Sequence, residues 1–256
     1  MSVALKVEGL SRSYGGIRAV EDVSFSTRPG AITGVIGPNG AGKTTLFNLI
    51  SGTVTPTAGR VVLDGENITG LSAGAVARRG LVRTFQMTTV FPDCSVLQNL
   101  YRAALFRQLP TPLALMNPAA VIAGRRRAEE AARAALALVD MTALAHSDAG
   151  ALAYGQQKVL GVGMALAAQP RMLLMDEPAA GLNPVETIAL GDLIARVHAT
   201  GINIVLVEHD MQLVMRLCER IVVLVNGRLL ADGAADEVRE DPRVVEAYLG
   251  ADLENA

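Results

Sequence analysis

The sequence predicts an α/β fold, in which helices cover a mainly parallel sheet and a further helical segment is inserted. Three short apolar runs, at 171–175, 202–207 and 221–225, are separated by helical stretches, a pattern typical of parallel strands buried on both faces. A glycine-rich loop at 37–45 joins a predicted strand to a predicted helix. Residues 96–139 are alanine-rich and helical, so we expect a group of helices between two strand-rich parts.

The first third of the chain is expected to consist mainly of short strands. Five segments have strand character: 5–7, 23–26, 31–36, 61–63 and 81–85. The turn dipeptide Asp64-Gly65 closes the fourth of them. A helix should continue over 46–51 and stop at Gly52, because glycine is favoured just past a helix end.

Capping and turn residues place three more elements in the last third. Asn183 and Pro184 predict the N-cap and the first turn of a helix, because asparagine caps free N–H groups and proline fits the first helical position. Asn226-Gly227 predicts a hairpin turn, which needs two residues that tolerate positive φ. A last short helix is expected over 243–249.

The composition favours a globular chain, which we interpret as a single domain over 1–256, and excludes several classes. Hydrophobic residues make up 50% of the chain and the net charge is −2, which excludes a disordered chain and gives no basic field for nucleic acid. The longest apolar run, 159–168, is too short to span a membrane. The two cysteines form no disulfide framework, and the first residues lack a signal-peptide pattern. We therefore expect a cytosolic globular protein.

Residues 37–44 match the phosphate-binding pattern G-x-x-x-x-G-K-[ST], after a predicted strand and before a helix. Its glycines let backbone N–H groups converge on phosphate oxygens, and the helix adds its positive N-terminal end. Lys43 supplies a positive charge for the β- and γ-phosphates, and Thr44 a hydroxyl for Mg²⁺. The ATP-binding residues predicted in this loop are Gly37, Pro38, Asn39, Gly40, Ala41, Gly42, Lys43, Thr44 and Thr45.

Two carboxylates end the apolar run at 171–175. In enzymes with such a phosphate-binding loop, or P-loop, an aspartate at this point holds the metal, usually through water, and Asp176 is predicted to do so. Glu177 is placed to act as general base on the attacking water. The sequence therefore predicts a nucleotide-binding ATPase whose cofactors are ATP and Mg²⁺.

Three further features identify a family. Gln86 ends the strand before the helical segment, Leu-Ala-Tyr-Gly-Gln at 152–156 opens a helix about twenty residues before Asp176, and His209 follows the apolar run at 202–207. Together with the P-loop, they resemble the ATP-binding subunit of an ABC transporter over nearly the whole chain. The resemblance implies a P-loop (RecA-like) core with a mainly parallel sheet, an N-terminal antiparallel β subdomain and an inserted α-helical subdomain.

The resemblance also implies domain boundaries and residue roles. The core with its antiparallel part would comprise 1–86 and 159–256, and the helical subdomain 87–158. Tyr14 matches the aromatic residue that stacks on adenine, and Val20 lies near the ribose. Gln86 matches the glutamine that senses Mg²⁺ and water, so the metal-binding residues that the resemblance implies are Thr44, Gln86 and Asp176. His209 matches the histidine that contacts the γ-phosphate, and the catalytic set is Glu177, His209 and Gln86.

Two loops are implied to act between subunits. The signature loop, which closes over the γ-phosphate bound by a partner, consists of Leu152, Ala153, Tyr154, Gly155 and Gln156. The loop that carries communication between the two sites consists of Gly181, Leu182 and Asn183. Ala153 stands where the family usually has serine, and Asn183 where it usually has aspartate. The first change removes a hydroxyl and the second a charge, but with the P-loop, Glu177 and His209 intact we predict an active ATPase.

The residues of these motifs look most like those of the ATPases of branched-chain amino acid importers. The resemblance implies a second ABC ATPase subunit (the same chain or a paralogue), two transmembrane permease subunits and, indirectly, a periplasmic or extracellular solute-binding protein. No nucleic-acid partner is expected. The chain would lie at the cytoplasmic face of the inner or plasma membrane as a peripheral protein. Permease helices would dock near Gln86 and 87–100, with Met87, Val90, Phe91 and Leu97 as candidate apolar contacts.

Other functions remain open at this point. The transported solute could be urea, an amide or a lipid-type molecule. A non-transport ABC ATPase that acts on nucleic acid or ribosomes is a different class, although the chain has one P-loop and no sustained heptads. Its tight basic cluster, 125–127, is interpreted as a solvated helix face. A P-loop kinase or GTPase is disfavoured by the signature loop, Glu177 and His209 together.

Overall fold

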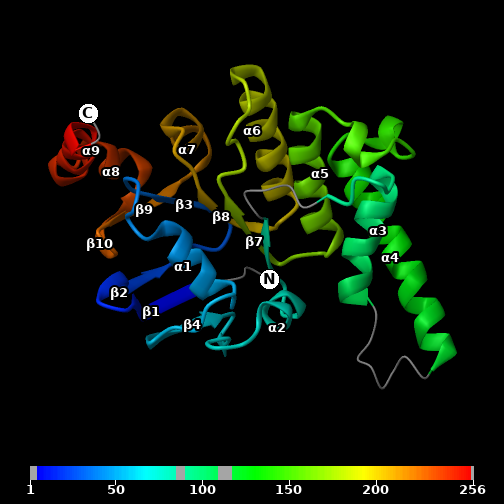
Figure 1. Ribbon diagram of the computed structural model, residues 1–256, viewed down its shortest axis with the longest axis horizontal. Coiled ribbons are helices and arrows are strands. Elements are labelled where there is room, and N and C mark those ends of the chain that lie inside the picture. The colour runs from blue at the N-terminus through cyan, green and yellow to red at the C-terminus, as the bar shows by residue number, and fades with distance from the viewer. Residues whose placement is uncertain (1–4, 85–89, 109–116, 255–256) are drawn as a thin grey trace.

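The computed structural model describes residues 5–84, 90–108 and 117–254, the last six of them by their backbone alone. The strands of these residues form two sheets (Figure 1). The strands are β1 (Leu5–Tyr14), β2 (Ile17–Ser26), β3 (Ile32–Ile36), β4 (Ala58–Leu63), β5 (Glu66–Asn67), β6 (Leu81–Thr84), β7 (Met172–Asp176), β8 (Asn203–Val207), β9 (Arg220–Val225) and β10 (Arg228–Ala234). The helices are α1 (Lys43–Ile50), α2 (Ala73–Arg78), α3 (Val96–Gln108), α4 (Pro118–Leu138), α5 (Tyr154–Ala167), α6 (Pro184–Ala199), α7 (Met211–Leu217), α8 (Ala235–Glu240) and α9 (Pro242–Glu254).

The larger sheet has the strand order β10-β9-β3-β8-β7-β6. Neighbouring strands from β9 to β6 run parallel, and β10 returns antiparallel to β9. The hairpin turn predicted at Asn226-Gly227 is confirmed, with φ of 49° and 77° at its two residues. The predicted α/β fold class with a mainly parallel sheet is therefore confirmed, and it brings the carboxyl ends of β3, β7 and β8 to one edge.

The smaller sheet has the order β2-β1-β4-β5, and each of its pairs is antiparallel. The expected N-terminal antiparallel part is thus confirmed. Its first two strands are ten residues each, longer than the predicted segments 5–7 and 23–26. Their pairing shifts register at several points along β1, and these irregularities break the alternation of buried and exposed residues that would have indicated the full length.

The large sheet is buried on both faces because its strands alternate between two apolar cores. On β7, Leu173 and Met175 belong to the core shared with α3 to α7, while Met172 and Leu174 pack with α1 and the antiparallel sheet. Figure 1 shows α5, α6 and α7 on one side of the sheet, and α1 with the antiparallel sheet on the other. This double burial explains why the strands are continuous apolar runs in the sequence.

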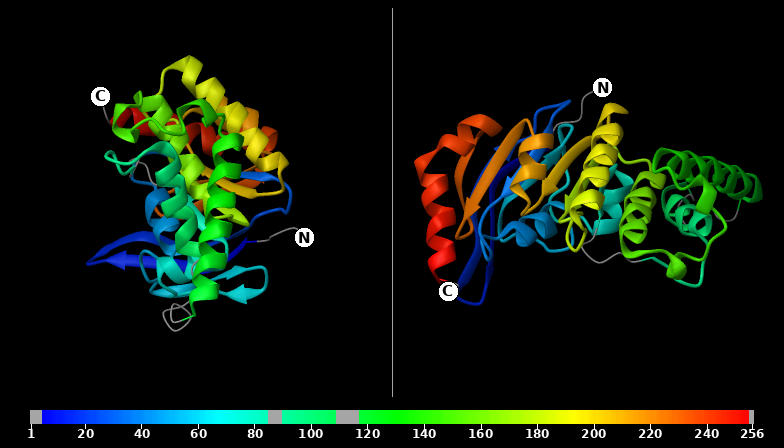
Figure 2. Two further views of the ribbon diagram at one scale, coloured as in Figure 1. Left: turned by 90° about the vertical axis from the view of Figure 1, so that its right-hand side faces the viewer. Right: turned by 90° about the horizontal axis from the view of Figure 1, so that it is seen from above.

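Helices α3, α4 and α5 are inserted between β6 and β7 and pack against one another. Figure 1 and the right-hand view of Figure 2 place α3 and α4 at the end of the molecule opposite α9. Asn117 caps α4 by accepting from the N–H groups of Ala119 and Ala120. The boundary predicted at 158 falls inside α5, and the division into 1–86, 87–158 and 159–256 stays a prediction. Among the helices described, none is long and apolar enough to cross a membrane.

Candidate active site

The P-loop connects β3 to α1 as predicted, and its backbone leaves the start of α1 open to an anion. The N-cap of α1 is Gly42, with φ of 97°, and no side chain of the described residues caps this end. The first turn also carries no acidic residue. Free N–H groups and the positive end of the helix therefore face the loop, which is the arrangement that binds phosphate.

Close packing explains two of the loop's glycines. A Cβ on Gly37 would collide with the carbonyl oxygen of Leu224 on β9, and a Cβ on Gly42 with the carbonyl oxygen of Ala19 on β2. Both obstacles are backbone atoms of neighbouring strands, so they cannot turn away. The loop is thus held between the two sheets, and only glycine fits at these points.

Lys43 is folded back over the loop. Its Nζ donates to the carbonyl oxygens of Gly37, at 2.7 Å, and Pro38, at 3.0 Å. Burial lowers the pKa of Lys43 below its usual value, while the negative charges of Glu177 and Asp176 act in the opposite direction. The ammonium group is therefore poorly hydrated and held beside the loop, where phosphate oxygens would be strong partners.

A cleft of about 480 Å³ opens above the loop. It is lined by Ile17, Arg18, Ala19, Asn39, Gly40, Ala41, Gly42, Lys43, Thr44, Thr45, Glu177, His209 and Asn226. The structure therefore brings together most of the predicted loop residues and two of the predicted catalytic residues. Strand β2 supplies part of the wall through Ile17, Arg18 and Ala19, which directly precede Val20, the residue expected near the ribose.

Glu177 and His209 both line this cleft, and their side chains are in contact. His209 Nε2 lies 2.9 Å from Glu177 Oε1. Glu177 follows β7 with φ of 46°, and its N–H donates to the carbonyl oxygen of Val207 at the end of β8. A non-glycine residue in this left-handed region is strained, so the backbone on both sides must hold it there. The two side chains thus meet because β7 and β8 are neighbours in the sheet.

Glu208 is a residue whose position the sequence did not reveal. Its side chain is buried, and its carboxylate accepts from the N–H of Ala179, at 2.7 Å, and from that of His209, at 3.2 Å. Burial raises the pKa of Glu208, and the two N–H donors partly offset this effect. The side chain ties the segment after Glu177 to the segment that carries His209.

Asp176 ends β7 and is almost fully buried, with 2% of its surface exposed. One carboxylate oxygen, Oδ2, accepts from Nη2 of Arg83 at 2.6 Å. The other, Oδ1, has no hydrogen-bond partner among the residues described. Carboxylate and hydroxyl oxygens are the ligands that Mg²⁺ prefers, and Thr44 lines the adjacent cleft. The residues present therefore fit a magnesium ion held by Asp176 and Thr44.

None of the signature-loop residues lines the cleft above the P-loop. Leu152 is buried, Ala153 is the N-cap of α5, and Tyr154 to Gln156 form its first turn. The Tyr154 hydroxyl donates to the carbonyl oxygen of Ala180, at 3.2 Å, and its ring lies where a side chain on Gly181 would have to stand. The signature loop and the predicted inter-site loop of one subunit are thus in contact.

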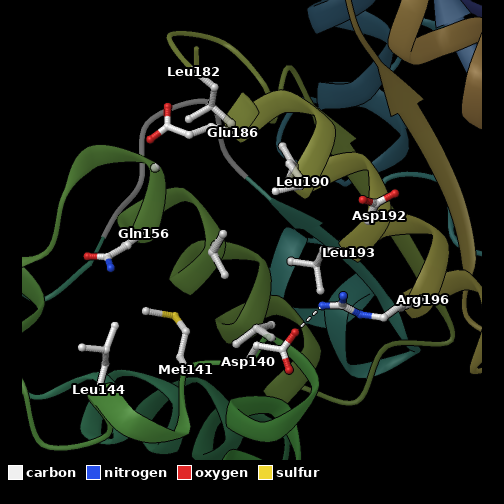
Figure 3. A pocket seen from close by; sticks show the side chains of 14 residues that line it. Asp140, Met141, Leu144, Gln156, Leu182, Glu186, Leu190, Asp192, Leu193 and Arg196 are labelled. Carbon is white, nitrogen blue, oxygen red and sulfur yellow. Dashed lines mark hydrogen bonds and ion pairs between the residues drawn. The ribbon is translucent and has the colours of Figure 1, made fainter. Parts of the chain in front are cut away.

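A second pocket of about 410 Å³ lies beneath this contact, between α5 and α6 (Figure 3). Gly155, Gln156, Leu182 and Glu186 line it, and the ion pair of Asp140 and Arg196 borders it.

The predicted cap at Asn183 is confirmed: its side chain accepts from the Glu186 N–H at 3.0 Å, and the Glu186 side chain accepts from the Asn183 N–H at 3.0 Å.

Two predicted site residues, Tyr14 and Val20, do not line the cleft, and the position of a third is not described. Gln86, like Met87, lies outside the described residues. Tyr14 is 43% exposed at the end of β1 with the Arg12 guanidinium 4.8 Å from its ring centre, and Val20 is buried in the core. Neither lines the cleft. Their roles at the base and the ribose of a nucleotide stay predictions.

Comparison with known proteins agrees with this geometry. A family profile described as ABC transporter matches residues 20–180, and one described as Branched-chain amino acid ATP-binding cassette transporter matches residues 228–254. The high-affinity branched-chain amino acid transport ATP-binding protein BraF of Pseudomonas aeruginosa is 43% identical over 249 residues, covering 96% of this chain and 97% of that protein. The protein LivG of Escherichia coli, described by the same words, is 42% identical over 254 residues with the same coverage.

The fold is also similar to that of a solved structure. The ADP conformation of an ATP-binding cassette of an ABC transporter has a TM-score of 0.84 and 30% identity, and the match covers 98% of this chain and 100% of that chain. The resemblance expected from the P-loop, the signature loop and His209 is therefore confirmed. The chain belongs to the ABC transporter family, in which it is an ATP-binding cassette.

Proposed function

We propose that this chain is the ATP-hydrolysing subunit of an importer for branched-chain or related amino acids. The single observation that supports hydrolysis most is the Glu177–His209 pair, which stands across the cleft from the P-loop at an Oε1–Nε2 distance of 2.9 Å. The choice of solute rests on the relatives BraF and LivG, which are named for branched-chain amino acid transport.

The residues of the cleft have different roles in the proposed hydrolysis of ATP. The free N–H groups at the start of α1 and the Lys43 ammonium bind and orient the phosphates. Glu177 accepts the proton of the attacking water, and His209 stays within reach of both Glu177 and the γ-phosphate. Bound at Asp176 and Thr44, Mg²⁺ would neutralise charge on the phosphates.

The working form is a dimer, with a second copy or with a paralogue. This step is supported by the lining of the cleft, to which none of the residues 152–156 of the same subunit contributes. Tyr154 is half exposed, and a partner's nucleotide would be the surface for this loop to cover. Each site is therefore incomplete without the other subunit, so that ATP bridges the two chains.

A groove of about 380 Å³ is the candidate docking site for the permease subunits. It lies between β6, α3 and α5, and includes Val82, Phe91, Phe106 and Met164. Phe91 and Phe106 are 44% and 49% exposed and line the same groove, and exposed apolar side chains that gather in one place mark interaction sites. Of the predicted contacts, Phe91 lines the groove, whereas Val90 and Leu97 pack on the main core.

The proposal is tested by transport in reconstituted vesicles. The chain would be combined with the permease and solute-binding proteins encoded beside its gene, and uptake of labelled leucine measured with ATP inside. We expect uptake with this chain and none with the matched Glu177→Gln variant. Uptake of urea, an amide or a lipid, but not of leucine, would keep the transport role and overturn the solute. Absence of any permease partner, with binding to ribosomes, would overturn transport itself.

A further inference from the structure

We propose that Arg83 is a positioning residue for the metal site: it fixes the Asp176 carboxylate by one oxygen and leaves the other for Mg²⁺ or its bound water. The inference rests on the proposed use of ATP with Mg²⁺. It assigns a role to an arginine that no motif singled out.

Strand register places the two side chains together. β6 and β7 are parallel neighbours, and Arg83 lies opposite Leu174. Because side chains alternate between the faces of a strand, Asp176 emerges on the same face as Leu174, two residues further along. That face packs on α1, so both charged groups are enclosed between the sheet and the P-loop helix. Their side chains are 7% and 2% exposed.

The guanidinium joins Asp176 to α1 through separate nitrogens. Nη2 donates to Asp176 Oδ2 at 2.6 Å, and Nη1 donates to Asn48 Oδ1 at 2.6 Å. The same Nη1 lies 3.4 Å from Ser51 Oγ, and the guanidinium carbon lies 5.8 Å from the centre of the Phe47 ring. The planar fork of arginine can reach these partners at fixed angles, whereas the single ammonium of lysine cannot. Asp176 is thereby held at a fixed place relative to the helix that begins with Lys43 and Thr44.

Because the Asp176 carboxylate is buried, it needs a positively charged partner. A carboxylate with 2% exposure is strongly unfavourable without a permanent positive partner, and arginine keeps its charge at every physiological pH. The pairing uses Oδ2 only, since Oδ1 has no hydrogen-bond partner among the residues described. A buried polar atom left in this way requires an explanation, and a metal-bound water or the metal itself supplies one.

A merely structural ion pair would stabilise the fold without changing the metal dependence of nucleotide binding. The two roles therefore separate in one measurement: the affinity for a fluorescent ADP analogue as Mg²⁺ is titrated, and again in EDTA without Mg²⁺. ADP is bound and not hydrolysed, so the readout does not depend on catalytic activity or on transport.

The variants are Arg83→Met, which removes the charge at similar length, and Arg83→Lys, which keeps the charge without the fork. Arg79→Met is the matched control, because Arg79 forms an exposed ion pair with Glu66 on the surface. We expect Arg83→Met to raise the Mg²⁺ concentration at half-saturation at least tenfold and to change ADP affinity in EDTA less than twofold. Arg83→Lys should fall between, and Arg79→Met should match the wild type. Should Arg83→Met fail to fold, Arg83→Lys carries the same comparison.

A double variant isolates the pathway of the effect. If Arg83 acts through Asp176, Arg83→Met should add little further loss of Mg²⁺ dependence to Asp176→Asn. Equal loss of ADP affinity with and without Mg²⁺, or an unchanged Mg²⁺ midpoint in both Arg83 variants, would overturn the proposal. A wild-type chain that binds no ADP would overturn the proposed function as well, which keeps the two failures distinguishable.

Discussion

The Nε2 atom of His209 lies 2.9 Å from Oε1 of Glu177, although 32 residues separate them in the chain. The contact exists because the two residues follow β7 and β8, which are adjacent parallel strands. The Glu177 N–H donates to the Val207 carbonyl oxygen, and the buried Glu208 accepts from the His209 N–H. These two hydrogen bonds fix the backbone of both residues at the edge of the sheet, which keeps Glu177, the proposed base, beside His209.

His209→Ala should slow ATP hydrolysis by about two orders of magnitude, a common size for a lost partner in proton transfer. Nucleotide binding to the P-loop should change little, because the N–H groups of α1 and Lys43 remain. Phosphate release and nucleotide affinity would be measured on the same preparation. His146→Ala is the control, since His146 is exposed and does not line the cleft. Equal slowing in both variants would contradict the assignment.

Replacement of two glycines of the P-loop by alanine should differ in cost. A Cβ on Gly37 collides with the Leu224 carbonyl oxygen, whereas a Cβ on Gly40 meets nothing within 4 Å and suffers only from its φ of 78°. Gly37→Ala should therefore lower the free energy of unfolding by roughly 3 kcal/mol or more, and Gly40→Ala by about 1–2 kcal/mol. Denaturant titration of both variants checks the order, and a larger loss in Gly40→Ala would contradict the close packing of the loop on β9.

Ala153→Ser should stabilise the chain. Ala153 is the N-cap of α5 but has no side-chain acceptor, and its own N–H donates to the Gln156 side chain at 3.1 Å. A serine hydroxyl could accept from a free N–H of the first turn, which is worth about 1 kcal/mol at an N-cap. Ala151→Ser, two residues earlier, is the matched control and should be neutral. Thermal unfolding of the two variants compares them, and equal melting temperatures would count against the cap.

Cys218 should make the chain less stable at alkaline pH. Burial raises the pKa of this thiol from 9.0 to about 12, so the folded state keeps its proton while the unfolded state loses it. Stability therefore falls as pH rises from about 9 towards 12, by up to about 1.4 kcal/mol per pH unit. Compared with Cys218→Ala, the wild type should lose roughly 1.4 kcal/mol more between pH 8 and pH 10. Parallel curves for the two proteins would show that the thiol is not the cause.

The site could be predicted from the sequence where its chemistry is local. The P-loop, Asp176 and Glu177 each stand in a short motif with a defined strand or helix beside it, and the structure describes them there. The parallel strands were predictable for a similar reason. Because both faces are buried, each strand is an unbroken apolar run that needs no knowledge of its neighbours.

Arg83 and Glu208 could not be predicted, because their positions depend on pairing between distant segments. An arginine at a strand end is usually solvent-exposed, and only the register of β6 against β7 buries it beside Asp176. The full lengths of β1 and β2 could not be predicted for another reason. Register shifts along β1 interrupt the alternation on which strand prediction relies. The six-residue helices α2 and α8 were too short to show a helical period.

The role of Glu177 is tested by phosphate release from ATP in the wild type and in Glu177→Gln, with binding of ATP measured in parallel. The side chain of glutamine keeps the size and polarity of glutamate but cannot accept the proton of water. We predict that the variant binds ATP as the wild type does and hydrolyses it 10² to 10⁴ times more slowly. Equal rates of phosphate release from the two proteins would show that Glu177, which lines the cleft with the P-loop, is not the base of an ATPase.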